Sequence, residues 1–302
     1  MIPTFRRADL VRRAAASALA QTVEDLEVLV VADGDDADAT AATEASLASL
    51  ADPRLRVLVP GRPLGNGAAR NFGVDHATAP LVALLDDDDE WFPRKLETQM
   101  PLCDGPNTLV THRLEARVGE NEVHLWPRRR PREGEDVGEY LFCPRRPGTG
   151  EGMIQTSTWL LPTDLLRRVR FAEGLRRYVD LDWIVRAAKT PGFRVAFAGW
   201  PEALGVWNIE PKRVRISTSD DGQFAVDWAN ERRDVLTPRA HAGFLLTLAS
   251  QSAAASGRRP GFWRILREAF KNGRPTLGPL ASHALHFGVP RGLLHAAARR
   301  RS

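Results

Sequence analysis

Five carboxylates follow one another directly at the end of an apolar run. The apolar run covers residues 81–85 (LVALL), and the acids are residues 86–90 (DDDDE). Carboxylates this close repel one another and raise one another's pKa, at a cost on the order of 1 kcal/mol per conflict unless a cation lies among them. Hard oxygen ligands select Mg²⁺ or Mn²⁺. The alternative is an acidic turn capping a helix that begins at Pro93, but a cap uses one acid and not five, so the pattern favours a metal site.

A second acidic segment, residues 33–38 (DGDDAD), follows the apolar run that ends at Val31. It is not a calcium loop, because its fifth and sixth positions are Ala37 and Asp38, and the sixth requires Gly. Two interpretations remain equal here. Asp33 accepts a hydrogen bond from a ligand's base or ribose at a turn between a strand and a helix, or it forms a plain Asx turn.

A glycine-bearing loop at residues 63–73 (PLGNGAARNFG) leads into a helical pattern, whose free N–H groups favour an anion. The loop has neither the Walker sequence nor the dinucleotide-binding glycine spacing. Arg70 within it is either a ligand contact or a surface cation. Further on, residues 178–186 (YVDLDWIVR) begin another helix with Asp180 and Asp182. Two positions apart on a helix, these acids do not share a face. One of them could take a proton from an acceptor hydroxyl, and both could instead cap the helix.

The elements that must position these residues alternate along the first hundred positions. Near-continuous apolar runs at 27–31, 55–59 and 81–85 predict strands buried on both faces, and helical patterns at 9–20, 40–50, 66–77 and 93–100 fill the gaps. This order is typical of βαβ units and a mostly parallel sheet flanked by helices. The carboxyl ends of such strands are where ligands bind, which agrees with the place of the acidic run.

Later segments follow a different pattern. Strands are expected at 107–111, 153–161 and 193–198, helices at 162–169 and 180–189, and a loop at 127–150, which is rich in Pro, Gly and charge. We expect a catalytic domain over residues 1–215, with nucleotide-sugar binding in 1–105 and an acceptor or catalytic part in 106–215. Residues 216–302 are expected to form a basic helical region with breaks at 257–260, 272–273 and 289–290.

The composition excludes several classes of protein. The chain of 302 residues is 43% apolar and 26% charged, which excludes a disordered or fibrous protein. Two cysteines without a Cys-x-x-Cys pair exclude a disulfide framework, and we expect neither a signal peptide nor a segment that spans a bilayer. The expected location is therefore cytoplasmic. Residues 235–302 hold eleven Arg or Lys against one acid, so this region either lies on a membrane surface or packs on the body. Because 38 of the 42 basic residues are Arg, as in GC-rich genomes, nucleic-acid binding is not inferred.

Taken together, the motifs have a recognisable order. Residues 2–9 (IPTFRRAD), 17–22 (SALAQT), 30–34 (VVADG), 65–71 (GNGAARN) and 85–93 (LDDDDEWFP) resemble the family 2 glycosyltransferases in sequence and spacing, over roughly residues 1–210. The resemblance implies a GT-A fold and an inverting, metal-dependent transfer of a sugar from a nucleotide-diphosphate donor, most simply UDP, to a carbohydrate or lipid-linked acceptor. It implies donor contacts for Pro3, Thr4, Phe5, Asp33, Arg70, Asp86 and Asp87, metal contacts for Asp86 and Asp88, and a catalytic base at Asp180.

Two departures from the family pattern bear on these expectations. Only Met1 and Ile2 precede the Pro-Thr motif, so the central strand is expected to be almost absent, and the usual paired acids after the second strand are reduced to Asp33. A catalytically inactive nucleotide-binding or partner-binding module is therefore one alternative. A nucleotidyltransferase is the other, although it would need a Gly-rich loop with Lys where this chain has Arg6 and Arg7.

Overall fold

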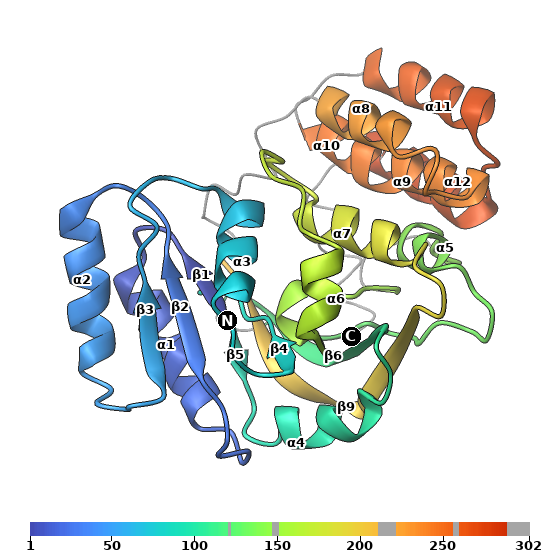
Figure 1. Cartoon of the computed structure of the whole chain (residues 1–302). Helices are drawn as coiled ribbons and strands as arrows, with labels where there is room; N and C mark the ends of the chain where they lie inside the picture. Colours follow the sequence, from blue (N-terminus) through green and yellow to red (C-terminus); the bar gives the residue numbers. More distant parts are fainter. Residues whose placement is uncertain (120–121, 147–150, 211–221, 256–259, 289–302) are drawn as a thin grey trace. The chain divides into compact units, whose positions relative to one another are not determined.

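The computed structural model describes the chain except residues 120–121, 147–150, 211–221, 256–259 and 289–302 (Figure 1). The chain forms two compact units. The first, which we call the N-terminal unit, comprises Met1–Leu125 and Ile154–Pro211, and the second, the helical unit, comprises Trp126–Met153 and Lys212–Ser302. The segment Trp126–Met153 therefore groups with the later helices, although the sequence analysis counted it with the catalytic domain.

The N-terminal unit begins with three parallel strands in the order β1-β2-β3. Ile2 of β1 lies opposite Val30 of β2, which in turn lies opposite Val57 of β3. Every residue of β2 is buried, as expected of a strand covered on both faces. The elements of this half are β1 (Ile2–Thr4), α1 (Ala8–Leu19), β2 (Val28–Ala32), α2 (Ala37–Ala48), β3 (Leu55–Leu58) and α3 (Asn66–Asp75). Their order confirms the predicted alternation of strands and helices.

The short first strand nevertheless holds a central position. The amino group of Met1 donates a hydrogen bond to the carbonyl of Ala83 (2.9 Å), and the N–H of Leu85 donates to the carbonyl of Met1 (3.1 Å). These bonds connect β1 to the end of β4 (Leu81–Ala83). The three-residue strand thereby brings the loop after β1 beside the acidic run that follows β4.

A second sheet is mixed rather than parallel. Over the described residues its strand order is β4-β8-β6-β9-β5, with β7 paired to β6. The long strands β6 and β9 run parallel, and the pairs β4-β8, β6-β8 and β5-β9 are antiparallel. Its strands are β4, β5 (Glu90–Trp91), β6 (Thr108–Val118), β7 (Glu122–Trp126), β8 (Leu160–Pro162) and β9 (Arg194–Ile209). The sequence analysis found only the first part of β6 and of β9, and it missed β7.

Two local expectations are wrong. The segment 127–150, expected to be a loop, contains α5 (Val137–Phe142), whose first turn is capped by Asp136 through the N–H of Glu139 (3.0 Å). The expected strand at 153–161 is instead a 3₁₀ turn, η2 (Thr156–Thr158), followed by the short β8. The side chain of Gln155 accepts a hydrogen bond from the N–H of Ser157 (2.7 Å), which satisfies a backbone donor that a strand would have paired.

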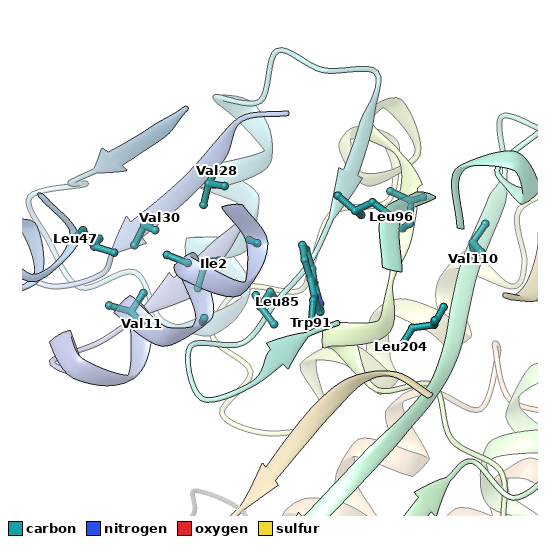
Figure 2. Close-up of a cluster of buried hydrophobic side chains, with 14 of the residues drawn as sticks. Ile2, Val11, Val28, Val30, Leu47, Leu85, Trp91, Leu96, Val110 and Leu204 are labelled. Carbon is teal, nitrogen blue, oxygen red and sulfur yellow. The ribbon is translucent and has the colours of Figure 1, made fainter. Parts of the chain in front are cut away.

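The core of the N-terminal unit lies between the sheet and its covering helices. Figure 2 shows Ile2, Val30 and Leu85 beside one another, with Trp91 and Leu96 continuing the cluster toward the second sheet. Burial of this apolar surface is the main favourable term in folding. Trp91 is 6% exposed and its indole N–H donates to the carbonyl of Ser157 (2.7 Å), so it is part of the core rather than of a sugar-binding surface.

Further helices complete both units. The N-terminal unit also contains α4 (Lys95–Gln99), α6 (Thr163–Arg168) and α7 (Val179–Ala187). The described part of the helical unit contains α5, α8 (Gln223–Glu231), α9 (Pro238–Phe244), a π-helical turn (Leu245–Ala249), α10 (Ser250–Ala255), α11 (Pro260–Asn272) and α12 (Leu277–Gly288). The break at 272–273 is confirmed, while the break at 289–290 lies outside the described residues. Within the described ranges, no helix is both long enough and apolar enough to cross a membrane.

Candidate active site

The four aspartates of the acidic run divide by burial, while Glu90 pairs with Arg13. Residues 86–89 form a turn in which the N–H of Asp89 donates to the carbonyl of Asp86 (3.2 Å). Asp87 and Asp89 are buried at 5% and 0% exposure. The side chains of Asp86 and Asp88 remain 30% and 29% exposed. The run therefore supplies two structural carboxylates below the surface and two accessible carboxylates at the rim of the sheet.

Asp87 anchors the loop after β1. Its carboxylate accepts hydrogen bonds from the Thr4 hydroxyl (2.8 Å) and from the Arg7 guanidinium (2.9 Å). Burial raises the pKa of Asp87, and the Arg7 charge and the Thr4 hydrogen bond oppose that rise. The sequence analysis expected Asp87 to contact the donor, and the structure places it beneath Thr4, where it orients that residue.

Asp89 holds the turn from the opposite side. It accepts hydrogen bonds from the Ser157 hydroxyl (2.6 Å), the Gln155 amide (2.8 Å) and the backbone N–H of Asn208 (3.1 Å). Burial and the charges of Asp86 and Asp88 raise the pKa of Asp89 well above its usual value. Ser157 also accepts from the N–H of Asp86 (3.0 Å), and the Asn208 amide donates to the carbonyl of Asp88 (2.8 Å).

None of these partners was identified from the sequence. Gln155, Ser157 and Asn208 lie far from the acidic run along the chain, and only the polar stretch 155–158 (QTST) inside an apolar segment marked two of them. Together they fix the backbone from which Asp86 and Asp88 project.

Asp86, Arg70 and Asp180 lie near one another. The Arg70 guanidinium is 3% exposed and donates to Asp86 (2.5 Å), and it lies 5.6 Å from the centre of the Phe171 ring. Burial raises the pKa of Asp180, the N–H of Leu181 and the charge of Arg70 lower it, and the charge of Asp86 raises it. These electrostatic effects indicate that Asp180, which the sequence resemblance implies to be a base, lies near the accessible end of the acidic run.

The two acids of α7 have separate roles. Asp182 is fully buried and pairs with the Arg186 guanidinium (2.8 Å) one turn along the same helix. Asp180 is half-buried and lies within electrostatic range of Arg70. The structure therefore distinguishes an acid that is buried in an ion pair from one that is partly exposed, and the role of Asp180 as a base stays a prediction.

A small pocket of about 10 Å³, room for about one water molecule, opens beside the same rim at the carboxyl ends of β1 and β2. Thr4, Asp33 and Gly34 are among the residues that line it. Phe5 is 50% exposed and packs over Gly34, where an added Cβ would lie 3.4 Å from the Phe5 ring. Pro3 lies in β1 opposite Val31 and positions these residues. The half-exposed ring is a surface on which a flat ligand can stack.

Asp33 has a defined contact of its own. Its two carboxylate oxygens accept hydrogen bonds from the N–H groups of Leu64 (2.6 Å) and Gly65 (2.9 Å). Gly65 precedes α3 with a φ of 80°, a conformation that favours glycine. Asp33 thus fixes the glycine-bearing loop against the end of β2, and its contact with a base stays a prediction.

The accessible carboxylates fit a divalent cation. In the part of the chain that the structure describes, no group of three or more His, Cys, Asp or Glu side chains is arranged to hold a metal alone. Mg²⁺, however, is usually held by one or two carboxylates together with substrate phosphates and water. Asp86 and Asp88 supply two accessible hard oxygen ligands on one turn, which matches that mode.

Comparison with known proteins identifies the family. The model of the family described as glycosyl transferase family 2 matches residues 1–169, more than half of the chain. The chain therefore belongs to this family. It is 26% identical over 254 residues to the amylovoran biosynthesis glycosyltransferase AmsB of Erwinia amylovora, a match that covers 80% of this chain and 81% of AmsB. Other glycosyltransferase relatives match over 32% of their own length.

Solved structures support the same fold. The structure of S. aureus TarS 1-349 in complex with UDP-GlcNAc matches with a TM-score of 0.59 at 15% identity, over 96% of this chain and 75% of that one. The mannosyltransferase PcManGT from Pyrobaculum calidifontis in complex with GDP-Man and Mn²⁺ matches with a TM-score of 0.53 at 18% identity, over 99% and 78%. The fold is a mixed α/β fold similar to that of GT-A glycosyltransferases, with a helical C-terminal region.

Proposed function

We propose that the protein transfers a sugar from a nucleotide-diphosphate donor, with UDP as the nucleotide, to a carbohydrate or lipid-linked acceptor hydroxyl, with inversion at the anomeric carbon. The observation that carries this proposal is the convergence of Asp180, Arg70 and Asp86 at the rim that also bears Asp88. A base and an accessible metal-binding turn are the two parts that such a transfer requires.

The nucleotide would lie over the surface around the small pocket beside the rim, because the pocket itself, at about 10 Å³, holds no more than a water molecule. The base would stack on Phe5 near Thr4 and Asp33, because this aromatic ring is half-exposed and packs against Gly34, which lines the pocket. The diphosphate would then extend toward Asp86 and Asp88. Arg70, which the sequence analysis assigned to the donor, would act through its bond to Asp86 and through its positive charge near the departing diphosphate.

In the proposed transfer step, the acceptor hydroxyl attacks the anomeric carbon. The acceptor oxygen forms a bond to the anomeric carbon while the bond from that carbon to the diphosphate oxygen breaks, and the electron pair leaves with the diphosphate. Asp180 takes the hydroxyl proton on the face opposite the leaving group, by analogy with inverting glycoside hydrolysis. The accessible position of Asp180, compared with the ion-paired Asp182, supports its role as the base.

The metal would be Mg²⁺ or Mn²⁺ held by Asp86 and Asp88. A bound divalent cation supplies Lewis-acid stabilisation of the negative charge on the leaving diphosphate. The contribution of the protein is the rigid turn, because Asp87 and Asp89 fix it through their buried hydrogen bonds.

A thermal-shift experiment tests the metal and donor assignments. UDP and GDP are added with and without Mn²⁺ to the wild type, to Asp88→Ala and to Asp164→Ala, whose side chain is 79% exposed on α6. We expect a stabilisation that requires metal in the wild type and in Asp164→Ala and that disappears in Asp88→Ala. Equal shifts in all three proteins would contradict the ligand role of Asp88. Metal-dependent UDP binding without turnover would favour an inactive binding module instead.

A further inference from the structure

Helix α11 presents aromatic and basic side chains together on its outward face. Trp263 is 71% exposed and Phe270 is 60% exposed. Because residues i, i+4, i+7 and i+8 fall on one side of a helix, Trp263, Arg267, Phe270 and Lys271 share this face. Large exposed aromatic side chains cost solubility, so two of them on one helical face indicate a contact surface.

The opposite face of α11 is already used. Ile265 and Ala269 are fully buried, and α11 packs on α9 and α10 within the helical unit. The helix lies on the outer side of this unit in Figure 1. Trp263 and Phe270 are therefore exposed although the opposite, apolar face of α11 is packed in the core of the helical unit.

The charge of this face is positive. Arg264, Arg267 and Lys271 are exposed along α11, and Arg274 follows just beyond its end. Glu268 is the single acid between residues 260 and 274, and its carboxylate accepts a hydrogen bond from the Asn272 amide. A surface of this kind is electrostatically complementary to anionic headgroups.

We propose that this face of α11 binds the surface of a bilayer that contains anionic phospholipids. Trp263 and Phe270 would enter the headgroup region, where indole rings are enriched at membrane interfaces, and Arg267 and Lys271 would contact lipid phosphates. The helix would lie along the surface and not cross it. A nucleic acid is a poorer fit, because the hollow that Trp263, Arg267 and Phe270 line is bounded by residues of α11 alone and is not a long basic groove that could follow a strand.

The test measures co-sedimentation of the full chain with vesicles, in the absence of any donor sugar, so its outcome is independent of the transfer reaction. Vesicles of phosphatidylcholine with phosphatidylglycerol are compared with pure phosphatidylcholine, at low and high salt. The variants are Trp263→Ala with Phe270→Ala, and Arg267→Gln with Lys271→Gln. The control is Val123→Ala with Leu125→Ala, which removes exposed apolar side chains from β7.

Binding should require the anionic lipid and weaken with salt. Each lost basic residue should reduce the partition coefficient about fivefold, as expected from roughly 1 kcal/mol per basic residue near an anionic surface. Loss of the aromatic pair should reduce it about tenfold or more, and the control should bind like the wild type. All variants fold if their circular dichroism spectra match that of the wild type, since the changed side chains are exposed.

Three results would overturn the proposal. The first is equal binding to neutral and anionic vesicles. The second is binding to the soluble polyanion heparin that the aromatic variant retains, without binding to vesicles. The third is a monomer–dimer equilibrium in sedimentation velocity that the Trp263 and Phe270 substitutions abolish while no vesicle binding occurs, because the face would then contact a second copy of the chain.

Discussion

Replacing Asp180 with Asn tests the chemical centre of the proposal. Asn has nearly the same size as Asp but cannot take a proton from the acceptor. A positioned general base contributes about 10²- to 10⁴-fold to a rate, or about 3 to 5 kcal/mol in the activation barrier. Because Asp180 lies within electrostatic range of Arg70 and Asp86 at the rim of the sheet, we expect the full loss of this contribution and little change in donor binding.

The matched control is Asp182→Asn, two positions along the same helix. Asp182 is buried and pairs with Arg186 (2.8 Å). Its replacement should lower the free energy of unfolding by about 1.5 to 3 kcal/mol, the range for a hydrogen bond to a charged group. The folded fraction should keep nearly normal turnover, because residues two apart do not share a helix face.

The assay for both variants is the release of nucleoside diphosphate from UDP-GlcNAc, UDP-glucose and GDP-mannose, with water as the acceptor, beside thermal shifts that report donor binding. Water needs the same proton removal as a sugar hydroxyl, so this readout does not depend on knowing the acceptor. Retained turnover in Asp180→Asn, or lost turnover in well-folded Asp182→Asn, would refute the assignment of the base.

Three further predictions concern pH and stability. The rate should fall as the pH drops through the raised pKa of Asp180, because the protonated carboxyl cannot accept a proton. Arg70→Gln should move this acid limb of the kcat/KM profile to higher pH, since the guanidinium lowers the pKa of Asp180. Burial lowers the pKa of Lys95 well below its usual value. Between that lowered pKa and about pH 10.4, the amine is neutral in the folded protein and protonated in the unfolded chain. Lys95→Met should therefore raise the free energy of unfolding at neutral pH in urea denaturation, and the gain should shrink by up to about 1.4 kcal/mol per pH unit toward pH 10.4; a gain that does not vary with pH would contradict a neutral Lys95. Ser157→Ala removes the donor to buried Asp89 (2.6 Å) and should cost about 1.5 to 3 kcal/mol in unfolding free energy by the same urea method, whereas unchanged stability would show that Asp89 is not held by this bond.

The alternation of strands and helices in the first hundred residues was predictable because it depends on local patterns. Continuous apolar runs such as 81–85 are typical of strands buried on both faces, and the structure has a strand at each of the three predicted places. The predicted burial holds throughout β2 but is wrong for β3, where no residue is buried. The later strands were predicted less well. In β6, buried and partly exposed residues alternate after Arg113, and the strand has register shifts beside His112 and Arg113, so no single apolar run marks its length.

The segment 127–150 shows the limit of composition as a guide. Its Pro, Gly and charged residues favoured a loop, yet Tyr140 and Phe142 are buried within α5. Arg129 pairs with Glu135 (2.6 Å), which satisfies part of the charge that made the segment look solvated. The helix is stabilised by burial of aromatic side chains against α9 of the same unit, where Phe142 contacts Phe244, and that contact is not visible in a local pattern.

The sequence by itself determined the chemistry available at the sheet rim. Five consecutive carboxylates after a predicted strand supply hard oxygen ligands for a divalent cation, however the chain packs. From the residues alone, the sequence did not tell which of Asp180 and Asp182 could take a proton from the acceptor. The tertiary structure decided which acids remain accessible: Thr4 and Arg7 bind Asp87, Ser157 and Gln155 bind Asp89, and Arg186 binds Asp182. Burial and hydrogen bonding of a carboxylate depend on partners that the chain brings from distant positions, and folding alone places them.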